Sequence, residues 1–485
     1  MFKHLGILLF TAAPLLAAEP KTITLDSADA RLKRAYALAR ETNDEAIIEK
    51  VLEYRDGVKR AFGRKDLVAA ERLVRDAEEC VGLDGGGETM LGLRVARIEP
   101  EMQKKLNALE ERLEKAMNGN DLTELAAVIA ESEKLLGDNA GVPDTRRKGD
   151  QGKALPVKPV DVAELFLKVV QIDPRSLKAL SSGMPVGDTL PRGYAAVVHG
   201  CLTIRPLVEK HFRDKLEIVD GLIKGCCAST IVLQVEKGHF KFPDLRGKHI
   251  RFGEMIEKLV AKDPDAIQDG WVVVPDPEGS SQFDAGECGI ALLRAGTILK
   301  NEDWKRAGLK AADWAMSAPL VTNFNYNAFS VSLLCEAHRV SGEKKYLDAA
   351  WKKYQFGVAP GQAANGRWID AHNARTVYHV ILLRSQHDLL EALPAGKERD
   401  TVEQSARRAV MALLEEAEKL GAPATSLTVR ELDRHARLAK ESPTNLREML
   451  EIAASAAVQR CSSGGRIRPG APLPELAAAS RVWEK

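Results

Sequence analysis

Three clusters of polar and aromatic residues occur between residues 271 and 393, and a hydrophobic stretch follows each one. The clusters are Gln282-Phe283-Asp284-Ala285-Gly286-Glu287, Asn323-Phe324-Asn325-Tyr326-Asn327 and Trp368-Ile369-Asp370-Ala371-His372-Asn373-Ala374-Arg375. Their carboxyl, amide, imidazole and phenol groups are types that transfer protons or bind a charged substrate. Their recurrence predicts a functional site in this part of the chain.

The stretches that follow the clusters have the patterns of paired helices. Each of three apolar segments has an amphipathic partner. A helix that is apolar all round must be surrounded by protein, whereas an amphipathic helix can face water. The alternation therefore predicts an inner ring of helices with an outer ring around it. The inner segments are 290–299, 328–334 and 377–383, and the outer ones are 303–316, 344–354 and 399–420. A further long apolar stretch, 194–236, is expected to break at Pro206.

Inner helices of such a ring would run parallel. Their N-termini, with unpaired backbone N–H groups and a partial positive charge, would then gather at one end. The polar clusters would line a shared mouth there. Capping is the alternative explanation for Asp284, Asn325, Asn327, Asp370 and Asn373, because Asp and Asn are favoured N-caps. Capping does not explain the Tyr, Trp, His and Arg residues at the same ends.

We therefore expect two sets of site residues, and neither a metal nor a cofactor. The catalytic set is Asp284, Tyr326, Asn327, Asp370, His372, Asn373 and Arg375. The substrate-binding set is Trp271, Gln282, Glu287, Asn323, Asn325, Trp368, Tyr378 and His379. For the two tryptophans and His379, packing in the core is the alternative to a role in the site.

The rest of the chain predicts an exported protein with a separate helical module. Residues 1–18 combine a basic start with an apolar run too short to span a bilayer, which favours a signal peptide over a buried helix. Residues 19–138 contain two helical hairpins with matching residues, such as Asp66 and Asp121. Residues 139–158 have the composition of a linker, residues 159–461 form the main domain, and residues 462–485 form a tail.

Composition limits the partners of the protein. The 485 residues have a formal net charge of +1, so no global field would attract nucleic acid or an anionic membrane. No stretch after the signal is long and apolar enough to span a membrane. The seven cysteines fit no zinc-site spacing, and we expect few or no disulfides. The N-terminal helical module is expected to bind a protein partner.

The alternation of buried and amphipathic hairpins, with Asn, Tyr, His and Asp clusters before the inner helices, resembles the α/α-toroid or six-hairpin glycosidase-like superfamily. The resemblance covers about residues 160–460. It implies an all-α fold in which a C-terminal (α/α) toroid, or incomplete barrel of hairpins, follows the N-terminal repeat module. The superfamily includes glycoside hydrolases, polysaccharide lyases and uronyl epimerases, so the resemblance implies a carbohydrate-active enzyme with a carbohydrate substrate. The predicted signal peptide implies that this enzyme is exported.

Three activities are consistent with the resemblance. In a lyase, amide and imidazole groups would neutralise a uronate carboxylate, a tyrosine would serve as base or proton donor, and an arginine would bind the acid group bidentately. The resemblance assigns these roles to Asn325 or Asn327 with His372 or Asn373, to Tyr326 or Tyr378, and to Arg375. The chain lacks the Asn-Asn-His-Ser-Tyr run of one toroidal lyase group. A hydrolase would need two carboxylates, from Asp284, Glu287 and Asp370. A glycan-binding or scaffold protein is the third alternative, since aromatic residues are 5% and no nucleophile is evident.

Overall fold

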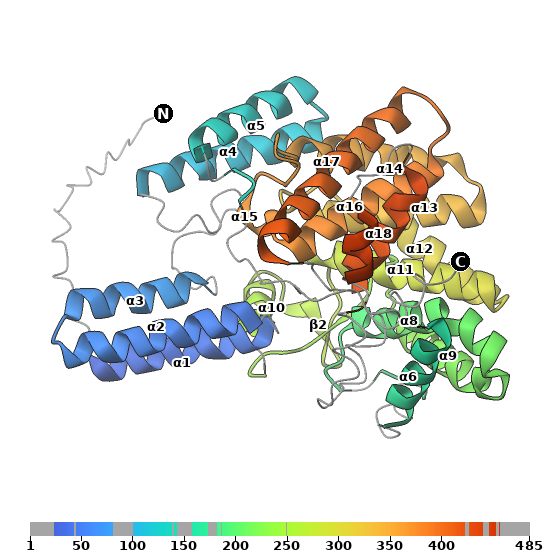
Figure 1. The fold of residues 1–485 in the computed structure, drawn as a ribbon, viewed down its shortest axis with the longest axis horizontal. Coiled ribbons are helices and arrows are strands. Elements are labelled where there is room, and N and C mark those ends of the chain that lie inside the picture. The colour runs from blue at the N-terminus through green and yellow to red at the C-terminus, as the bar shows by residue number, and fades with distance from the viewer. Residues whose placement is uncertain are drawn as a thin grey trace, which may run out of the picture. The chain divides into compact units, whose positions relative to one another are not determined.

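The computed structural model describes an all-α protein with one small sheet (Figure 1). The described residues are 24–42, 45–80, 100–137, 140–142, 158–172, 182–185, 187–248, 250–421, 426–439, 446–452 and 455. The predicted signal peptide, most of the predicted linker and the predicted tail lie outside these residues. The chain divides into two compact units, Met1–Gly85 and Gly86–Lys485. The division falls between the two hairpins of the predicted N-terminal module.

The first unit contains three helices that pack on one another. They are α1 (Leu25–Thr42), α2 (Glu45–Gly63) and α3 (Leu67–Cys80). Alanine and leucine side chains along α1 are buried at helical spacing and form one apolar face. An isolated helix of this length is only marginally stable, so packing of this face stabilises it. The carboxylate of Asp66 accepts a hydrogen bond from the backbone N–H of Ala69 at the start of α3.

The second unit begins with the matching hairpin, α4 (Pro100–Gly119) and α5 (Leu122–Leu136). Asp121 caps α5 by accepting hydrogen bonds from the N–H groups of Thr123 and Glu124, and Gly137 is the C-cap residue with φ 54°. The predicted turn chemistry of this hairpin is therefore confirmed. Its apolar side chains are continuous with the core of the rest of the unit.

The next helices are α6 (Pro159–Ile172), α8 (Pro191–His211) and α9 (Leu216–Val232). The expected break at Pro206 is wrong, because α8 continues through this proline to His211. The break falls instead at the 3₁₀ turn Arg213–Lys215. Helix α10 (Ile250–Lys262) follows, and the antiparallel strands β1 (Phe242–Pro243), β3 (Trp271–Val272) and β2 (Ile267–Gln268) form a sheet in that order.

Hairpins of helices form the remainder of the unit. They comprise α11 (Ser280–Ile298) with α12 (Glu302–Ser317), α13 (Phe324–Ser341) with α14 (Lys344–Gly357), and α16 (Thr376–Ala392) with α17 (Lys397–Leu420). The short helix α15 (Ala371–Ala374) precedes α16, and α18 (Ser426–Leu438) follows α17. Residues 446–452 are also helical.

The first helices of successive hairpins pack against one another in the order α8, α11, α13, α16 and α18. The close approaches show that the first four run parallel. Along α8 and α11, Arg192 meets Asp284 and His199 meets Glu287. Along α11 and α13, Gln282 meets Ser330 and Arg294 meets Glu336. Along α13 and α16, the amide of Asn325 meets Asn373 at one end, while Glu336 and Glu391 line one pocket at the other. This packing of inner helices with outer partners is compatible with a helical toroid.

The inner helices are buried on nearly all sides, as their apolar patterns predict. Their core side chains include Ile290, Leu292, Leu333 and Leu382, all fully buried. Among the described residues, no helix is long and apolar enough to cross a membrane.

Candidate functional site

The parallel arrangement brings part of the predicted site together at the N-terminal ends of α13 and α15. The amide of Asn325 donates to the Oδ1 atoms of Asn323, at 2.7 Å, and of Asn373, at 2.8 Å. The amide of Asn373 donates to Asn323 Oδ1 at 3.2 Å and to both carboxylate oxygens of Asp370, at 3.1 and 3.0 Å. Asn323, Asn325, Asp370 and Asn373 thus form one hydrogen-bonded group, here called the amide cluster.

Asp370 is the acidic member of the amide cluster and is completely buried. It is also the N-cap of α15, because its Oδ1 accepts a hydrogen bond from the backbone N–H of Asn373 at 2.7 Å. Burial raises the pKa of the Asp370 carboxyl to about 7, against the opposing effect of the hydrogen bonds from Asn373. The carboxyl group can therefore exchange a proton near neutral pH, as general acid–base catalysis requires.

The hairpin of α4 and α5 is attached to the loops that lead into this cluster. The Asn118 amide bonds both the N–H and the carbonyl of Leu320, and Thr322 donates to Glu110 Oε1 at 2.6 Å. The N–H of Gly141 donates to the carbonyl of Ile369, next to Asp370. The negative charge of Glu110 also raises the pKa of Asp370, as a smaller contribution than burial. The second predicted repeat therefore supports the site directly.

Asp284 lies in the first turns of α11 and contacts α8. Its Oδ1 atom lies 3.7 Å from Nε of Arg192 and accepts no hydrogen bond. Burial raises the pKa of the Asp284 carboxyl, although the positive charge of Arg192 opposes the shift. The Arg192 guanidinium also lies 4.4 Å from the centre of the Phe283 ring. Asp284 is thus a second buried carboxyl group whose pKa is raised by burial.

Among the other predicted site residues, Tyr326 lies on α13, His372 on α15 and Tyr378 on α16, and Arg375 lies between α15 and α16. The ring of His372 stacks on that of Tyr378, with centroids 4.0 Å apart. His372 and Arg375 are buried, whereas Tyr326 and Tyr378 are each partly exposed. A histidine and a tyrosine in ring contact beside the amide cluster could serve as a proton-transfer pair.

Several predicted site residues make contacts that stabilise the fold. The Asn327 side chain accepts from the N–H of Val321 and donates to the carbonyls of Val321 and Gly357. The Trp368 indole donates to the Val358 carbonyl, and the His379 ring is in an edge contact with Trp368 and bonded to the Ala409 carbonyl. These contacts favour the packing alternative for Trp368 and His379.

Gln282 and Trp271 also have structural contacts. The Gln282 amide donates to the Pro319 carbonyl at 3.0 Å, and its oxygen accepts from the Ser330 hydroxyl at 2.7 Å. This side chain therefore ties α11 to α13 and to the loop before α13. Trp271 lies in β3 and packs partly buried against the main core.

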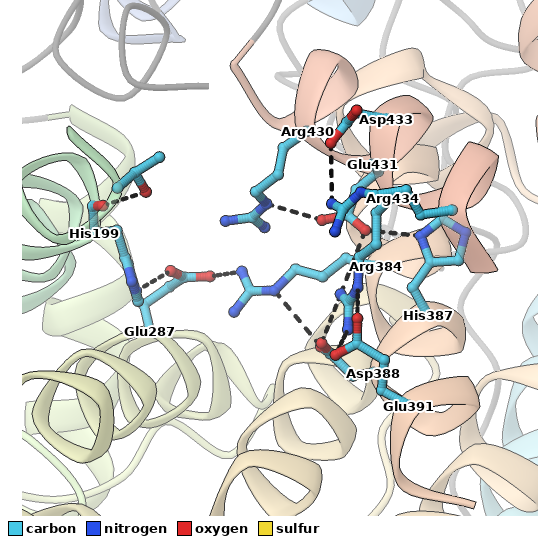
Figure 2. A network of polar contacts seen from close by, with 12 residues as sticks. His199, Glu287, Arg384, His387, Asp388, Glu391, Arg430, Glu431, Asp433 and Arg434 are labelled. Atoms are coloured by element: carbon cyan, nitrogen blue, oxygen red, sulfur yellow. Dashed lines mark hydrogen bonds and ion pairs between the residues drawn. The ribbon is translucent and has the colours of Figure 1, made fainter. Parts of the chain in front are cut away.

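Glu287 belongs to a charged network that the sequence did not predict (Figure 2). It pairs with Arg384 of α16 and lies 3.2 Å from His199 of α8. Burial alone would raise the pKa of the Glu287 carboxyl, but Arg384 and His199 more than offset this and lower it below its usual value. Glu287 is thus held as an ionised partner of Arg384, and it is poorly suited to donate a proton.

The same network continues from Arg384 to α18. Asp388 accepts from Arg434 at 2.8 Å, and Arg434 also pairs with Glu391 and Glu431. Figure 2 shows His387 directed toward Glu431, at a distance of 2.8 Å. The signal that could have revealed the network is the presence of Arg384, His387 and Asp388 in a helix that must be buried, since buried charges need partners.

The chain matches no protein-family model and no curated protein sequence.

The cysteines and possible metal ligands offer no further centre in the described residues. Five cysteines there are free and buried, namely Cys201, Cys226, Cys227, Cys288 and Cys335. Burial raises the pKa of each of these thiols, which makes them poor nucleophiles. No group of three or more His, Cys, Asp or Glu residues within the described ranges could hold a metal ion.

Proposed function

We propose that the protein is an exported, carbohydrate-active enzyme whose second unit is an α/α toroid that cleaves uronate-containing polysaccharides by β-elimination. The observation that carries the proposal is Asp370, a fully buried carboxyl group with a pKa of about 7 and no ion-pair partner among the described residues. It lies in the amide cluster at the N-terminal ends of parallel helices. A perturbed carboxyl group with specific polar partners is a candidate for a functional residue.

In this mechanism the residues beside Asp370 carry the proton transfers. The partial positive charge of the helix N-termini and the Arg375 guanidinium would stabilise the uronate carboxylate. Tyr378 would first lose its phenolic proton to the imidazole of His372, which stacks on it. The resulting phenolate would remove the proton from C5. The electron pair would form the C4=C5 double bond as the C4–O bond breaks, and the leaving oxygen would take a proton from Tyr326 or from protonated Asp370.

The proposal is tested by incubating the protein with a panel of acidic polysaccharides and following the absorbance of the unsaturated uronate product. Tyr378→Phe should reduce the rate about 100-fold or more, because general acid–base catalysis contributes about that much. Tyr346→Phe is the matched control, since the Tyr346 hydroxyl bonds Asp313 on the outer helices. Absence of the unsaturated product with every acidic glycan would refute elimination.

Hydrolysis is the second candidate, because Asp284 and Asp370 are both buried carboxyls whose pKa values burial raises. One would act as a general acid and the other as a base or nucleophile. The test measures reducing ends released from neutral and acidic glycans. Asp284→Asn and Asp370→Asn should each abolish release, and the product should lack the double bond. Saturable glycan binding without any product would instead support the non-catalytic alternative.

A further inference from the structure

The hairpin of α4 and α5 contacts both segments that supply the amide cluster. The loop before α13 ends at Asn323, and the segment before α15 ends at Asp370. The hairpin bonds the first loop through Asn118 and Glu110, and the N–H of Gly141, which follows α5, donates to the second segment. One hairpin therefore joins two segments that must keep a fixed separation for the cluster to form.

A series of contacts leads from Glu110 to Asp370. The Oε1 atom of Glu110 accepts from the hydroxyl of Thr322 at 2.6 Å, and Thr322 directly precedes Asn323 in the chain. The Oδ1 atom of Asn323 accepts from the Asn373 amide at 3.2 Å. The same amide donates to both carboxylate oxygens of Asp370, at 3.1 and 3.0 Å. The position of Glu110 is thus coupled to that of Asp370 through one loop residue and one amide.

Glu110 also acts on Asp370 through its charge. Burial is the largest cause of the raised pKa of the Asp370 carboxyl, and the negative charge of Glu110 adds to it. A like charge close to a carboxyl group favours its protonated form. The other charged or titratable side chains of the adjoining segments are His372 and Arg375, on and after α15, and Arg367, which pairs with Glu416 of α17.

We propose that Glu110 is a positioning residue of the proposed active site, which holds the loop before α13 through Thr322 and keeps a negative charge beside Asp370. This charge favours a proton on Asp370 near neutral pH. The inference rests on the proposed function only for the fate of that proton, which Asp370 would give to the leaving oxygen. A glutamine at position 110 retains an acceptor for the Thr322 hydroxyl but has no charge, so it separates the two roles.

The experiment follows the titration of Asp370 in the full chain by NMR, with ¹³C at the side-chain carboxyl of aspartate. The spectrum of Asp370→Asn identifies the signal. Glu110→Gln should lower the midpoint of this titration by about 0.5–1 pH unit, because a like charge is removed. Glu111→Gln is the matched control, since it removes the same charge from the next, exposed position of α4. An unchanged midpoint in Glu110→Gln, or an equal shift in Glu111→Gln, would overturn the assignment.

Two variants of Thr322 test the positioning role. Thr322→Val removes the hydroxyl that bonds Glu110 at nearly constant size and should also lower the midpoint of Asp370, whereas Thr322→Ser keeps the hydroxyl and should restore the wild-type value. A wild-type midpoint in Thr322→Val would show that the loop does not position the charge and would overturn this role. The titration needs no substrate, so absence of the unsaturated product would refute the proposed function without altering this result.

Discussion

Replacement of Gly286 by alanine tests the close packing of α11 on α13. A Cβ atom at this position would lie 2.7 Å from Cβ and 2.9 Å from the carbonyl oxygen of Phe329. The backbone carbonyl cannot rotate away, so one helix must shift. Overpacking of this kind costs about 3 kcal/mol at the upper end of its usual range. Alanine in a helix recovers about 1 kcal/mol relative to glycine. We therefore expect Gly286→Ala to reduce the free energy of unfolding by about 2 kcal/mol.

Gly221→Ala provides the matched control, because a Cβ atom at Gly221 in α9 would meet nothing within 4 Å. This variant should gain about 1 kcal/mol from helix propensity alone. The two variants should thus differ by about 3 kcal/mol in urea unfolding followed by circular dichroism. Phe329 stacks on Phe283 with centroids 4.1 Å apart, so the shift in Gly286→Ala should also reduce any catalytic activity. Equal stability of the two variants would refute the close approach of the inner helices.

Three further perturbations test the site and its support. The raised pKa of Asp370 means that ionisation of this carboxyl group opposes folding. The free energy of unfolding of the wild type should therefore fall, relative to that of Asp370→Asn, by on the order of 4 kcal/mol between about pH 4 and pH 7. Parallel pH curves for the two proteins in urea unfolding would contradict this. Asn327→Ala leaves the buried N–H of Val321 and the carbonyls of Val321 and Gly357 without their partner, and should reduce the free energy of unfolding by about 2–3 kcal/mol in thermal unfolding. Asn301→Ala removes one N-cap hydrogen bond and should reduce it by about 1 kcal/mol. Arg384→Met leaves Glu287 buried without its guanidinium and should cost about 3–5 kcal/mol, and the double variant with Glu287→Leu should recover most of that loss if the pair is the cause.

The periodicity of apolar residues predicted the helices and their pairing, because a helix face that is buried requires apolar residues at helical spacing. The first cluster, however, lies inside α11, and most of the second lies inside α13, whereas the third precedes α16 as predicted. Helix α11 begins at Ser280, ten residues before the apolar segment that marked it, so Gln282 and Asp284 face neighbouring helices from its first turns. Polar residues in the first turn hide a helix start, since they interrupt the apolar pattern.

The roles of individual polar side chains were harder to predict than the helices. Asp370 and Asn327 both lie near the start of a helix. The Asn327 amide nevertheless donates to the Gly357 carbonyl, whereas Asp370 accepts from Asn373 in the amide cluster. The difference depends on which backbone groups lie within reach, and segments distant in sequence supply these groups. Arg384 and Glu287, which pair across 97 positions of the chain, show the same limitation.

Asp370 differs from the other buried carboxylates in its partners. In the described part of the chain, Glu287, Asp388 and Glu431 each pair with an arginine, which offsets the cost of burying a charge. Asp370 has amide and backbone donors but no cationic partner there. An asparagine at this position could also cap α15, but its NH₂ group would replace an oxygen that accepts from the Asn373 amide. The carboxyl group at position 370 thus satisfies the Asn373 amide but buries an ionisable group without a cation, and the proposed proton transfer depends on this property.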